Sequence, residues 1–499
     1  MLSMLWVPPL SAQVRDLTLQ DAILLALDAN PDLAVSRVDV NRAMSQVDVQ
    51  AGVFDPKFDF TVDRINRESP TATELDGAKV QISDTRRANV GVSSQLKDGT
   101  KLSTTLNNRR SETNSRFTSL NPNFTSNLVL SFTRPLIKGG GRTPNLSQWR
   151  QAVNARYRAE KDWLRVAQDT VQAVARAYWD MVFAQRDVLV KNQAVAGAQK
   201  LLDYNRRRQE IGVGSEVETL EAESVLAARR EELVSSRRLV GLSHQELMAL
   251  LSYEAIGFGV TLDPVDSPDP GEDRPVLEES LRAAFEGRVE VEAALIDIRS
   301  RQIQVTYLKN QKRPQVDLTG GYTLNGLGRT LADAHEQVLE AGFPEWTLGF
   351  TVAVPLNNRA NRGQLETGRH DLDRARKTLQ LLQNRIRKEV NTAFLSVESD
   401  LERVSAARLA ESLAERKLDA EETRYEQGLI SNFDLLRFQE DLSSARSRAV
   451  RAVTDLLKSR TDLDRATGHI LEVRGITMDV RTLTRTLEGL VMPPATPSM

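Results

Sequence analysis

The sequence predicts a mostly α-helical protein with a β-barrel part, built from two copies of one plan that contains long helical hairpins. Two stretches of about 65 residues lack proline and almost lack glycine, which is typical of very long helices. Shorter segments alternate apolar and polar residues with the period of two that is typical of β-strands. The two halves of the chain carry these segments in the same order, which indicates an internal duplication.

The composition excludes several classes of protein. The chain has 499 residues, of which 27% are charged and 40% are hydrophobic, so it contains enough apolar material to fold. It has no cysteine, which excludes a disulfide-stapled miniprotein and a cysteine-ligated zinc site. The net charge of -2 gives no reason to expect nucleic acid as a partner. No run of about 18 apolar residues occurs, so any membrane crossing would have to be made by strands.

The ends of the chain and one internal segment delimit the two repeats. Residues 1–12 are apolar and finish on small residues, so they resemble the end of a secretory signal peptide. The first repeat is expected at 17–262 and the second at 276–471, and the proline-rich segment 263–275 is expected to be a linker between them. The tail 472–499 finishes in a stretch with nothing to bury, so its end is expected to be disordered.

Two pairs of matching segments reveal the duplication. Residues 55–60 (DPKFDF) match residues 313–318 (RPQVDL), which lie 258 positions farther along the chain. Residues 208–223 match residues 424–439 at a distance of 216 positions, and this alignment pairs a glycine, a serine and an acidic residue. Because the second distance is smaller, the first repeat carries an insertion between its strand region and its long helix.

Alternating segments predict the strands of each repeat, at about 54–134 in the first and about 314–355 in the second. The apolar positions expected to face lipid in the second repeat are Tyr322, Trp346, Leu348, Phe350 and Val352. Small or polar residues lie between them, as they do in a barrel wall between lipid and a wet lumen. A half-buried sheet of a soluble protein shows the same alternation, so both interpretations stay open.

The insertion contains a predicted β-hairpin at 89–108, because Asp98 and Gly99 join two alternating segments. The faces of this hairpin are mostly Ser, Thr and Asn. We therefore expect a projection or a rim rather than a lipid-facing wall, with two additional barrel strands as the alternative.

Long helices are predicted at about 145–210 and 364–426, each on the order of 100 Å long if continuous. Apolar residues step by three and four along both helices. Each helix turns at a glycine-containing tip and returns as a shorter one, which makes helical hairpins of about 145–252 and 364–468.

Neither the hairpins nor the strands of one chain form a closed structure. Two hairpins cannot surround a cavity, and a few strands leave open sheet edges. A trimer of a duplicated chain gives a pseudo-sixfold ring, which would bury the apolar seams between hairpins and complete a barrel. We therefore expect a homotrimer.

Taken together, these features resemble the TolC-type outer-membrane efflux and secretion channel family (outer membrane factors). The resemblance covers about residues 17–471 and rests on LTLQDAILLALDANPDL (17–33), FTRPLIKGGGR (132–142), the duplicated plan and the tips. It implies a homotrimer with a shared β-barrel in the bacterial outer membrane and an α-helical tunnel in the periplasm. It also implies outer-membrane lipid, a periplasmic adaptor (membrane fusion) protein and an inner-membrane transporter of the RND, ABC or MFS type as partners. The implied function is the exit duct of a tripartite efflux pump or a type I secretion system, gated at the periplasmic tips.

The resemblance also assigns roles to residues at the tips. Glu218 and Asp434 match the acidic positions of the periplasmic constriction, and Tyr425 matches an aromatic one. First-turn helix charge is the alternative interpretation of the two acids. The expected adaptor-docking positions are Gly212, Val213, Gly428 and Leu429. This chain has Ile430 where well-studied members have arginine, and Arg437 where they have an acid, so their closed-state lock and cation preference are not carried over unchanged.

No catalytic or cofactor motif is found. The four histidines stand far apart in the sequence, and the glycine-rich segment 138–142 lacks the residue order of a phosphate-binding loop. We therefore expect no enzymatic activity, no metal and no cofactor. A non-channel periplasmic coiled-coil scaffold or adaptor protein is the competing function, because long Arg- and Glu-rich helices fit it equally well. The apolar rows at 322–324 and 346–354 favour a channel, since a scaffold does not need them.

Overall fold

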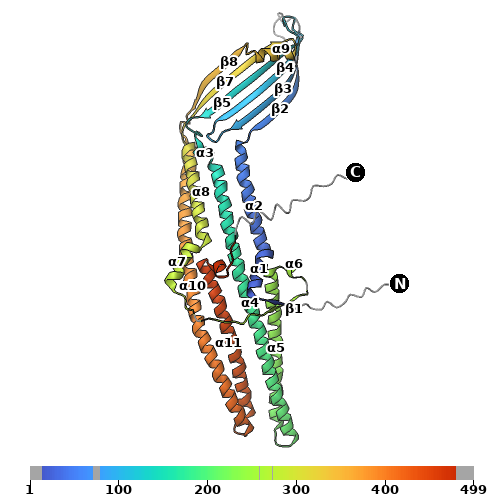
Figure 1. Ribbon diagram of the computed structural model, residues 1–499, viewed down its shortest axis with the longest axis vertical. Coiled ribbons are helices and arrows are strands. Elements are labelled where there is room, and N and C mark those ends of the chain that lie inside the picture. Colours follow the sequence, from blue (N-terminus) through green and yellow to red (C-terminus); the bar gives the residue numbers. More distant parts are fainter. Residues whose placement is uncertain (1–13, 71–78, 258, 272, 479–499) are drawn as a thin grey trace, which may run out of the picture. The chain divides into compact units, whose positions relative to one another are not determined.

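The computed structural model describes residues 14–70, 79–257, 259–271 and 273–478 (Figure 1). The expectation of a signal-peptide end at 1–12 and that of a disordered chain end lie outside the described residues.

The described chain forms two compact units. We call one the helical unit, which comprises the residues up to 40, those of 159–293 and those from 379 on. The other is the sheet unit, which comprises 41–158 and 294–378. Each unit takes segments from both halves of the sequence, so the compact units do not coincide with the sequence repeats.

Helices make up most of the described chain. Before the linker they are α1 (Leu19–Ala29), α2 (Pro31–Ala51), the 3-10 helix η1 (Gly52–Phe54), α3 (Arg142–Asn145), α4 (Ser147–Glu210), α5 (Glu216–Leu251) and α6 (Tyr253–Ile256). After it they are α7 (Leu277–Gly287), α8 (Val289–Gln311), α9 (Leu331–Leu339), α10 (Arg359–Glu426), α11 (Asn432–Thr467) and α12 (Ile470–Val473). Within the described ranges, no helix combines the length and the apolar composition that a membrane crossing requires.

Two helices are exceptionally long, with 64 residues in α4 and 68 in α10. Neither contains a proline, so the backbone hydrogen bonds run without interruption. The helix α5 returns along α4, and their seam is packed with small and aliphatic side chains, namely Ala198, Leu202, Ala222 and Leu226. The hairpin of α10 and α11 has a comparable seam that includes Val390, Val397, Ala452 and Leu456.

The largest core of the helical unit surrounds Tyr178 of α4, whose side chain is fully buried. Its hydroxyl lies 3.0 Å from the carbonyl oxygen of Leu17 and 2.8 Å from Oδ2 of Asp266, and burial raises its pKa. Oδ2 of Asp266 also accepts a hydrogen bond of 2.7 Å from the backbone N–H of Leu19. The linker residue Asp266 thereby joins the start of α1 to the middle of α4.

A parallel two-stranded pair adjoins this core and was not predicted from the sequence. Strand β1 (Val14–Leu17) pairs with β6 (Thr261–Pro264), so segments about 250 residues apart in the chain lie side by side. Strand β6 ends at the first proline of the linker, where a residue without a backbone N–H can be accommodated.

The sheet unit contains one six-stranded antiparallel sheet among the described residues, in the order β2-β3-β4-β5-β7-β8. The strands are β2 (Lys57–Pro70), β3 (Val80–Gln95), β4 (Lys101–Thr113), β5 (Asn123–Pro135), β7 (Gln315–Gly328) and β8 (Pro344–Ala353). Every ladder runs without a bulge and pairs even-numbered residues with even-numbered ones. Because side chains alternate along a strand, all even-numbered residues of the six strands share one face of the sheet.

The predicted hairpin of the insertion is part of this sheet, so the expectation of a projection is wrong. Strands β3 and β4 pair with each other, with β2 on one side and with β5 on the other (Figure 1). Backbone hydrogen bonds hold these strands in place whatever their side chains, and the abundant Ser, Thr and Asn lie mostly on the odd-numbered face. The even-numbered face of the two strands still contains Val90, Val92, Leu102 and Leu106.

The helix α9 interrupts the segment predicted as strands in the second repeat. Its first turn is closed by a capping box between Thr330 and Asp333. It packs against the even-numbered face of the sheet, where Gly326 leaves room for it: a Cβ on this glycine would lie 1.9 Å from the backbone oxygen of Ala334. Nε2 of His335 lies 2.7 Å from Oδ1 of Asn108 on the same face.

Candidate functional site

The first helical hairpin reverses direction through a Schellman motif at the end of α4. The backbone N–H of Val213 donates to the carbonyl of Arg208 at 2.9 Å, and the N–H of Gly212 donates to that of Gln209 at 3.0 Å. Gly212 has a φ of 80°, a left-handed conformation that glycine adopts without the penalty paid by residues with a Cβ. The local sequence therefore determines where this hairpin turns.

The second hairpin reverses through the same motif, 216 residues later. The N–H of Leu429 donates to the carbonyl of Arg424 at 2.9 Å, and that of Gly428 donates to the carbonyl of Tyr425 at 2.9 Å. Gly428 has a φ of 77°. Val213 and Leu429 occupy the same place in the motif, and the side chain of each is 63% exposed.

Glu218 and Asp434 lie in the first turns of the return helices, where each closes a capping box. The N–H of Val217 donates to Oγ of Ser215 at 3.2 Å, while the N–H of Ser215 donates to Oε2 of Glu218 at 3.4 Å. In the second hairpin the N–H of Asp434 donates to Oγ of Ser431 at 3.2 Å. The helix dipole favours both carboxylates at these positions, so each acid has a structural role besides any role in a constriction.

A buried polar network connects the two hairpins just above their tips. The hydroxyl of Tyr425 in α10 donates to Oδ1 of Asn205 in α4 at 2.9 Å. Nδ2 of Asn205 donates to Oδ1 of Asn432 in α11 at 2.9 Å and to the carbonyl oxygen of Glu218 in α5 at 3.2 Å. The two asparagines are only 1% and 2% exposed, so their amides depend on these partners rather than on water.

Charged and aromatic groups surround this network. Nη1 of Arg208 lies 3.7 Å from Oε2 of Glu218, and the rings of Tyr204 and Tyr425 are 5.8 Å apart. Burial raises the pKa of Tyr425 although the nearby Arg208 lowers it, so the hydroxyl stays protonated and can donate.

The structure brings Tyr425 and the backbone of Glu218 together, whereas the side chain of Asp434 stays in its own capping box. The two residues that depart from the family pattern lie outside the polar network. Ile430 packs beside the apolar cluster of Leu201, Tyr425, Leu435 and Leu436, and Arg437 is exposed.

Sequence reasoning missed Asn205 and Asn432, the two asparagines at the centre of the network. A signal for Asn205 was present, because this polar residue continues the apolar step of Ala198 and Leu202 along one face of α4. The sequence around Asn432 contains no comparable signal, since an asparagine at a helix start is common.

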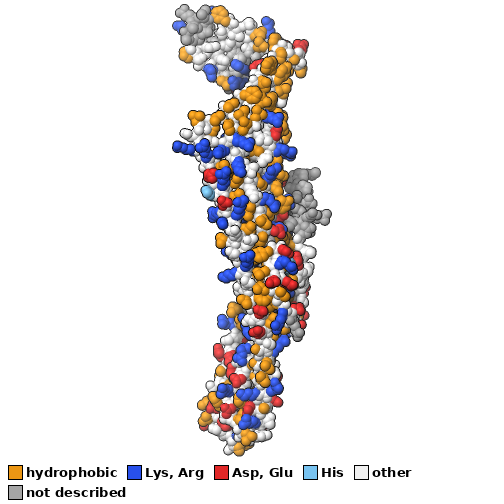
Figure 2. Space-filling view, turned by 90° about the vertical axis from the view of Figure 1, so that its left-hand side faces the viewer, with side chains coloured by type: hydrophobic (Ala, Val, Ile, Leu, Met, Phe, Trp, Pro, Cys, Tyr) orange, Lys and Arg blue, Asp and Glu red, His pale blue; other side chains and the backbone are white. Residues whose placement is uncertain are grey.

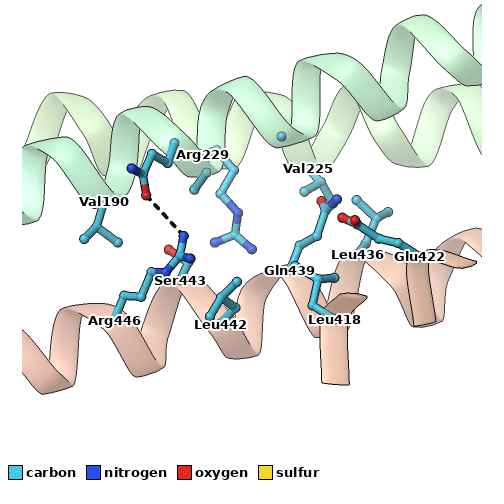
Figure 3. A pocket seen from close by; sticks show the side chains of 13 residues that line it. Val190, Val225, Arg229, Leu418, Glu422, Leu436, Gln439, Leu442, Ser443 and Arg446 are labelled. Atoms are coloured by element: carbon cyan, nitrogen blue, oxygen red, sulfur yellow. Dashed lines mark hydrogen bonds between the residues drawn. The ribbon is translucent and has the colours of Figure 1, made fainter. Parts of the chain in front are cut away.

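A cavity of about 120 Å³ lies between the same two hairpins (Figure 3). Its wall combines aliphatic side chains with Arg229, Glu422 and Arg446. The guanidinium of Arg446 donates to Gln193 at 3.1 Å, and Arg229 pairs with Glu232 of α5 and Glu440 of α11. Burial and the charges of Asp419 and Glu426 raise the pKa of Glu422. The hairpins are therefore joined by polar contacts around an incompletely filled seam.

The even-numbered face of the sheet is apolar over much of its area, and Figure 2 shows hydrophobic side chains gathered over the part of the chain that carries the sheet. The same face also carries ion pairs on β2, β3 and β4, namely those of Asp84 with Arg64 and Arg86 and that of Arg110 with Glu112. The five positions expected to face lipid all lie on this face and are exposed, namely Tyr322, Trp346, Leu348, Phe350 and Val352. Tyr322 lies directly opposite Trp346. At Gly320 a Cβ would lie 2.3 Å from the ring of Phe132, which shows that this ring covers the glycine.

The odd-numbered face is polar. One row across five strands consists of Thr61, Asn89, Asn107, Asn127 and Asn325. The side chains of Asn127 and Asn325 are hydrogen-bonded, as are those of Ser103 and Ser131 at 2.7 Å. In the described part of the chain, no group of three or more His, Asp or Glu side chains is arranged to hold a metal ion.

Comparison with known proteins identifies relatives of this chain. The model of the family described as "Outer membrane efflux protein" matches residues 22–252 and 281–469. Nodulation protein T of Rhizobium leguminosarum bv. viciae is 21% identical over 300 residues, which are 59% of this chain and 60% of that protein. The match thus spans less than two thirds of the length of this curated relative.

Solved structures share the fold. The CmeC outer membrane channel of Campylobacter jejuni has a TM-score of 0.69 at 14% identity, with 94% of this chain and 88% of that chain covered. The outer-membrane channel OprN has a TM-score of 0.69 at 17% identity, with 90% of each chain covered. The family model accounts for well over half of the residues, on both sides of the linker. The chain therefore belongs to the outer membrane efflux protein family and is a protein of the bacterial outer membrane.

Proposed function

We propose that three copies of this chain form the exit duct of a tripartite efflux pump or a type I secretion system. In this duct the sheets close a β-barrel in the outer membrane, and the helical hairpins form a tunnel in the periplasm. The observation that carries the proposal is the pair of hairpin tips with the same backbone motif, joined by the network of Tyr425, Asn205 and Asn432. A structure that must open and close at one end requires such a separable contact.

Exposed apolar side chains support the trimer. On α10 they include Leu381, Leu395 and Leu409, which are spaced by two heptads. On α5 they include Leu220 and Val234, again fourteen residues apart. Large aliphatic side chains at heptad spacing are typical of helices that pack against further helices, and a second copy supplies them. Because the row on α10 differs from the row on α5, each copy would contact its neighbours through two different surfaces. Such a head-to-tail contact closes into a ring.

The proposed gate lies at the tips. Glu218, Asp434 and Tyr425 are its candidate constriction residues, and the buried asparagines are the contact that holds the closed state. Separating the hairpins would break the hydrogen bonds of Asn205 with Asn432 and Tyr425, and the groups involved would lack these partners until water reaches them. The closed state is therefore expected to persist until a partner protein stabilises the separated hairpins.

The same tips are the proposed docking surface for a periplasmic adaptor, which would connect the duct to an inner-membrane transporter of the RND, ABC or MFS type. Gly212 and Gly428 set the turn, and Val213 and Leu429 present one exposed aliphatic side chain each at equivalent positions. A trimer would present six such positions in a ring, which suits a partner that repeats the same helical contact.

The proposal is tested by extracting the protein from envelopes in detergent, measuring its mass and recording its conductance in planar lipid bilayers. Trimers with a low resting conductance are expected. A monomer without conductance would contradict the duct and restore the periplasmic scaffold as the better account. Family membership favours the channel over that scaffold.

Docking is tested separately with Val213→Asp and Leu429→Asp, which should abolish co-purification with the adaptor encoded by the same organism. Val35→Asp is the matched control, because Val35 is equally exposed but lies on α2. Co-purification that survives both tip substitutions would contradict docking at the tips.

A further inference from the structure

The sheet of one chain contains six strands, four from the first repeat and two from the second. Six strands pair continuously in the described residues, and β3 and β4 lie in the interior of the sheet. Their ladders with β2, with each other and with β5 are each at least eleven residue pairs long. They are therefore full members of the sheet and not an appended hairpin.

The two edge strands are suited to pair with further copies of the same chain. The strands alternate in direction, and their number is even, so β2 and β8 run in opposite directions. When a second copy continues the sheet, its β2 lies antiparallel to β8 of the first copy. The alternation then continues through any number of copies without interruption.

Apart from their end residues Lys57, Pro70 and Pro344, both edge strands lack the features that protect an open sheet edge in water. Edge strands of soluble proteins commonly carry lysines, prolines or bulges that prevent pairing. Here β2 has exposed Phe58, Phe60 and Val62, and β8 has the exposed row from Trp346 to Val352, on the same even-numbered face. The apolar face thus extends to both edges, as it must if the sheet of the next copy continues it.

We propose that the barrel has eighteen strands, six from each of three copies, with β3 and β4 as wall strands whose Val90, Val92, Leu102 and Leu106 face lipid. This inference rests on the trimer of the proposed function. Barrel diameter grows roughly in proportion to strand number, so the barrel would be about 1.5-fold wider than one with four strands per copy. Barrels of about 16 to 18 strands enclose an aqueous channel.

The width determines the class of solute that the exit admits. The odd-numbered face would line the lumen, and its central rows consist largely of Asn, Ser and Thr. Such a wall is hydrated and carries charges of both signs, such as Asp63 beside Arg87 and Arg109 in one row, so it provides no apolar constriction. The exit would pass bulky hydrated solutes, and selection would take place at the hairpin tips and at the inner-membrane partner.

The absence of cysteine from the chain allows a direct test by disulfide formation in the assembled trimer. Thr61→Cys/Asn127→Cys places thiols on β2 and β5, which the proposal separates by β3 and β4. Three strand spacings amount to about 14 Å, which exceeds the reach of a disulfide. No bond is expected within the chain. Ser103→Cys/Ser131→Cys is the positive control, because these side chains are in contact on adjacent strands.

Electron microscopy of the trimer in lipid nanodiscs supplies the second readout. Eighteen strands in the cross-section of the wall are expected. A disulfide between positions 61 and 127, or a wall of twelve strands with the hairpin of β3 and β4 outside it, would overturn the proposal. Failure to form a trimer that conducts ions would instead count against the proposed duct itself, so the two failures are distinguishable.

Discussion

The hydroxyl of Tyr425 in α10 donates a hydrogen bond of 2.9 Å to Oδ1 of Asn205 in α4, and the two residues are 220 positions apart in the chain. The same asparagine donates to Asn432 in α11 at 2.9 Å and to the carbonyl oxygen of Glu218 in α5 at 3.2 Å, so all four helices of the two hairpins meet at one amide. Because the amide is buried, loss of any partner leaves a polar group without compensation. Loss of one partner therefore weakens the contact between the hairpins.

Tyr425→Phe removes the hydroxyl and leaves Oδ1 of Asn205 without its donor. The expected cost is about 1–3 kcal/mol of stability for the contact between the hairpins. We expect a higher resting conductance in planar bilayers, because the closed state loses this stabilisation. Tyr204→Phe is the control, since Tyr204 contacts the ring of Tyr425 but is partly exposed. An equal rise in conductance for both variants would contradict the role of the hydroxyl.

Gly212→Ala and Gly428→Ala should each destabilise the protein by about 1–2 kcal/mol, because a Cβ is strained in the left-handed conformation. No atom lies within 4 Å of the added Cβ at either position, so the cost is conformational rather than steric. Gly241→Ala in the interior of α5 also meets no atom, and it should stabilise by about 0.5–1 kcal/mol. The midpoint of thermal unfolding should thus fall for the two tip variants and rise for Gly241→Ala. Shifts of the same sign would show that the tip glycines are not strained on substitution.

Leu348→Arg places a charge on the even-numbered face of β8, which is proposed to face lipid. A cost of about 2–4 kcal/mol and a loss of membrane-inserted protein are expected if this position lies near the middle of the bilayer. Thr347→Arg places the same charge on the odd-numbered face one residue away and should be tolerated. Measuring the amount of each variant in purified outer membranes shows which face of the sheet contacts lipid. Equal tolerance would contradict the lipid-facing assignment.

Asp464 should make the protein less stable as the pH rises through the range from about 4 to 6. Burial raises its pKa to about 6 although Arg474, Arg460 and His469 lower it. The folded protein thus holds a proton there that the unfolded chain has released. The cost of the ionised carboxyl is about 3 kcal/mol at pH 7.

Asp464→Asn should therefore raise the melting temperature at pH 7 and change it little at pH 4. Asp441→Asn on the same helix is the control, because Asp441 is exposed. If the Asp464→Asn variant and the wild type have the same melting temperature at both pH values, ionisation of the Asp464 carboxyl does not destabilise the folded protein, which contradicts the prediction.

Glu290 should stabilise the folded protein at neutral pH, in contrast to Asp464. Burial alone would raise its pKa, but the hydrogen bonds from Arg288 and the charge of Arg465 lower it to about 2. Since this pKa is below that of the unfolded chain, the stabilisation is present above about pH 4.5 and is lost as the pH falls through about 2. Glu290→Gln leaves two buried guanidinium groups with fewer partners, at a cost of about 3 kcal/mol near neutral pH.

Glu292→Gln, two residues along α8, is the control for this prediction. Glu292 pairs with Lys161 at 2.5 Å but is about half exposed, so its loss should cost less than about 1 kcal/mol. Urea unfolding at pH 7 and at acidic pH measures both variants. Equal destabilisation at pH 7 would contradict the buried network around Glu290.

The sequence predicted the features that depend on neighbouring residues. The long helices follow from proline-free runs with apolar steps of three and four. The two tips follow from glycines at equivalent positions of a duplicated segment, and the structure has the same pair of backbone hydrogen bonds at each. The roles of Glu218, Asp434 and Tyr425 in a constriction, and those of the tip residues in docking, stay predictions.

The sequence did not predict the features that depend on residues far apart in the chain. The polar faces of β3 and β4 suggested a projection, but backbone pairing with β2 and β5 incorporates both strands into the sheet. Asn205 and Asn432 looked like ordinary helix residues because each finds its partners only when two hairpins meet. The short helix α9 was missed because its capping box lies within a segment of strands.

The amino-acid sequence by itself determined the two long hairpins, their turning points and the two-faced character of the strands. Each of these depends on side-chain periodicity or on a backbone conformation within a few residues. Only the tertiary structure decided how many strands share one sheet and which polar groups are buried together. Backbone hydrogen bonds between strands carry no side-chain signature, and an amide becomes costly or stabilising only once folding has removed it from water.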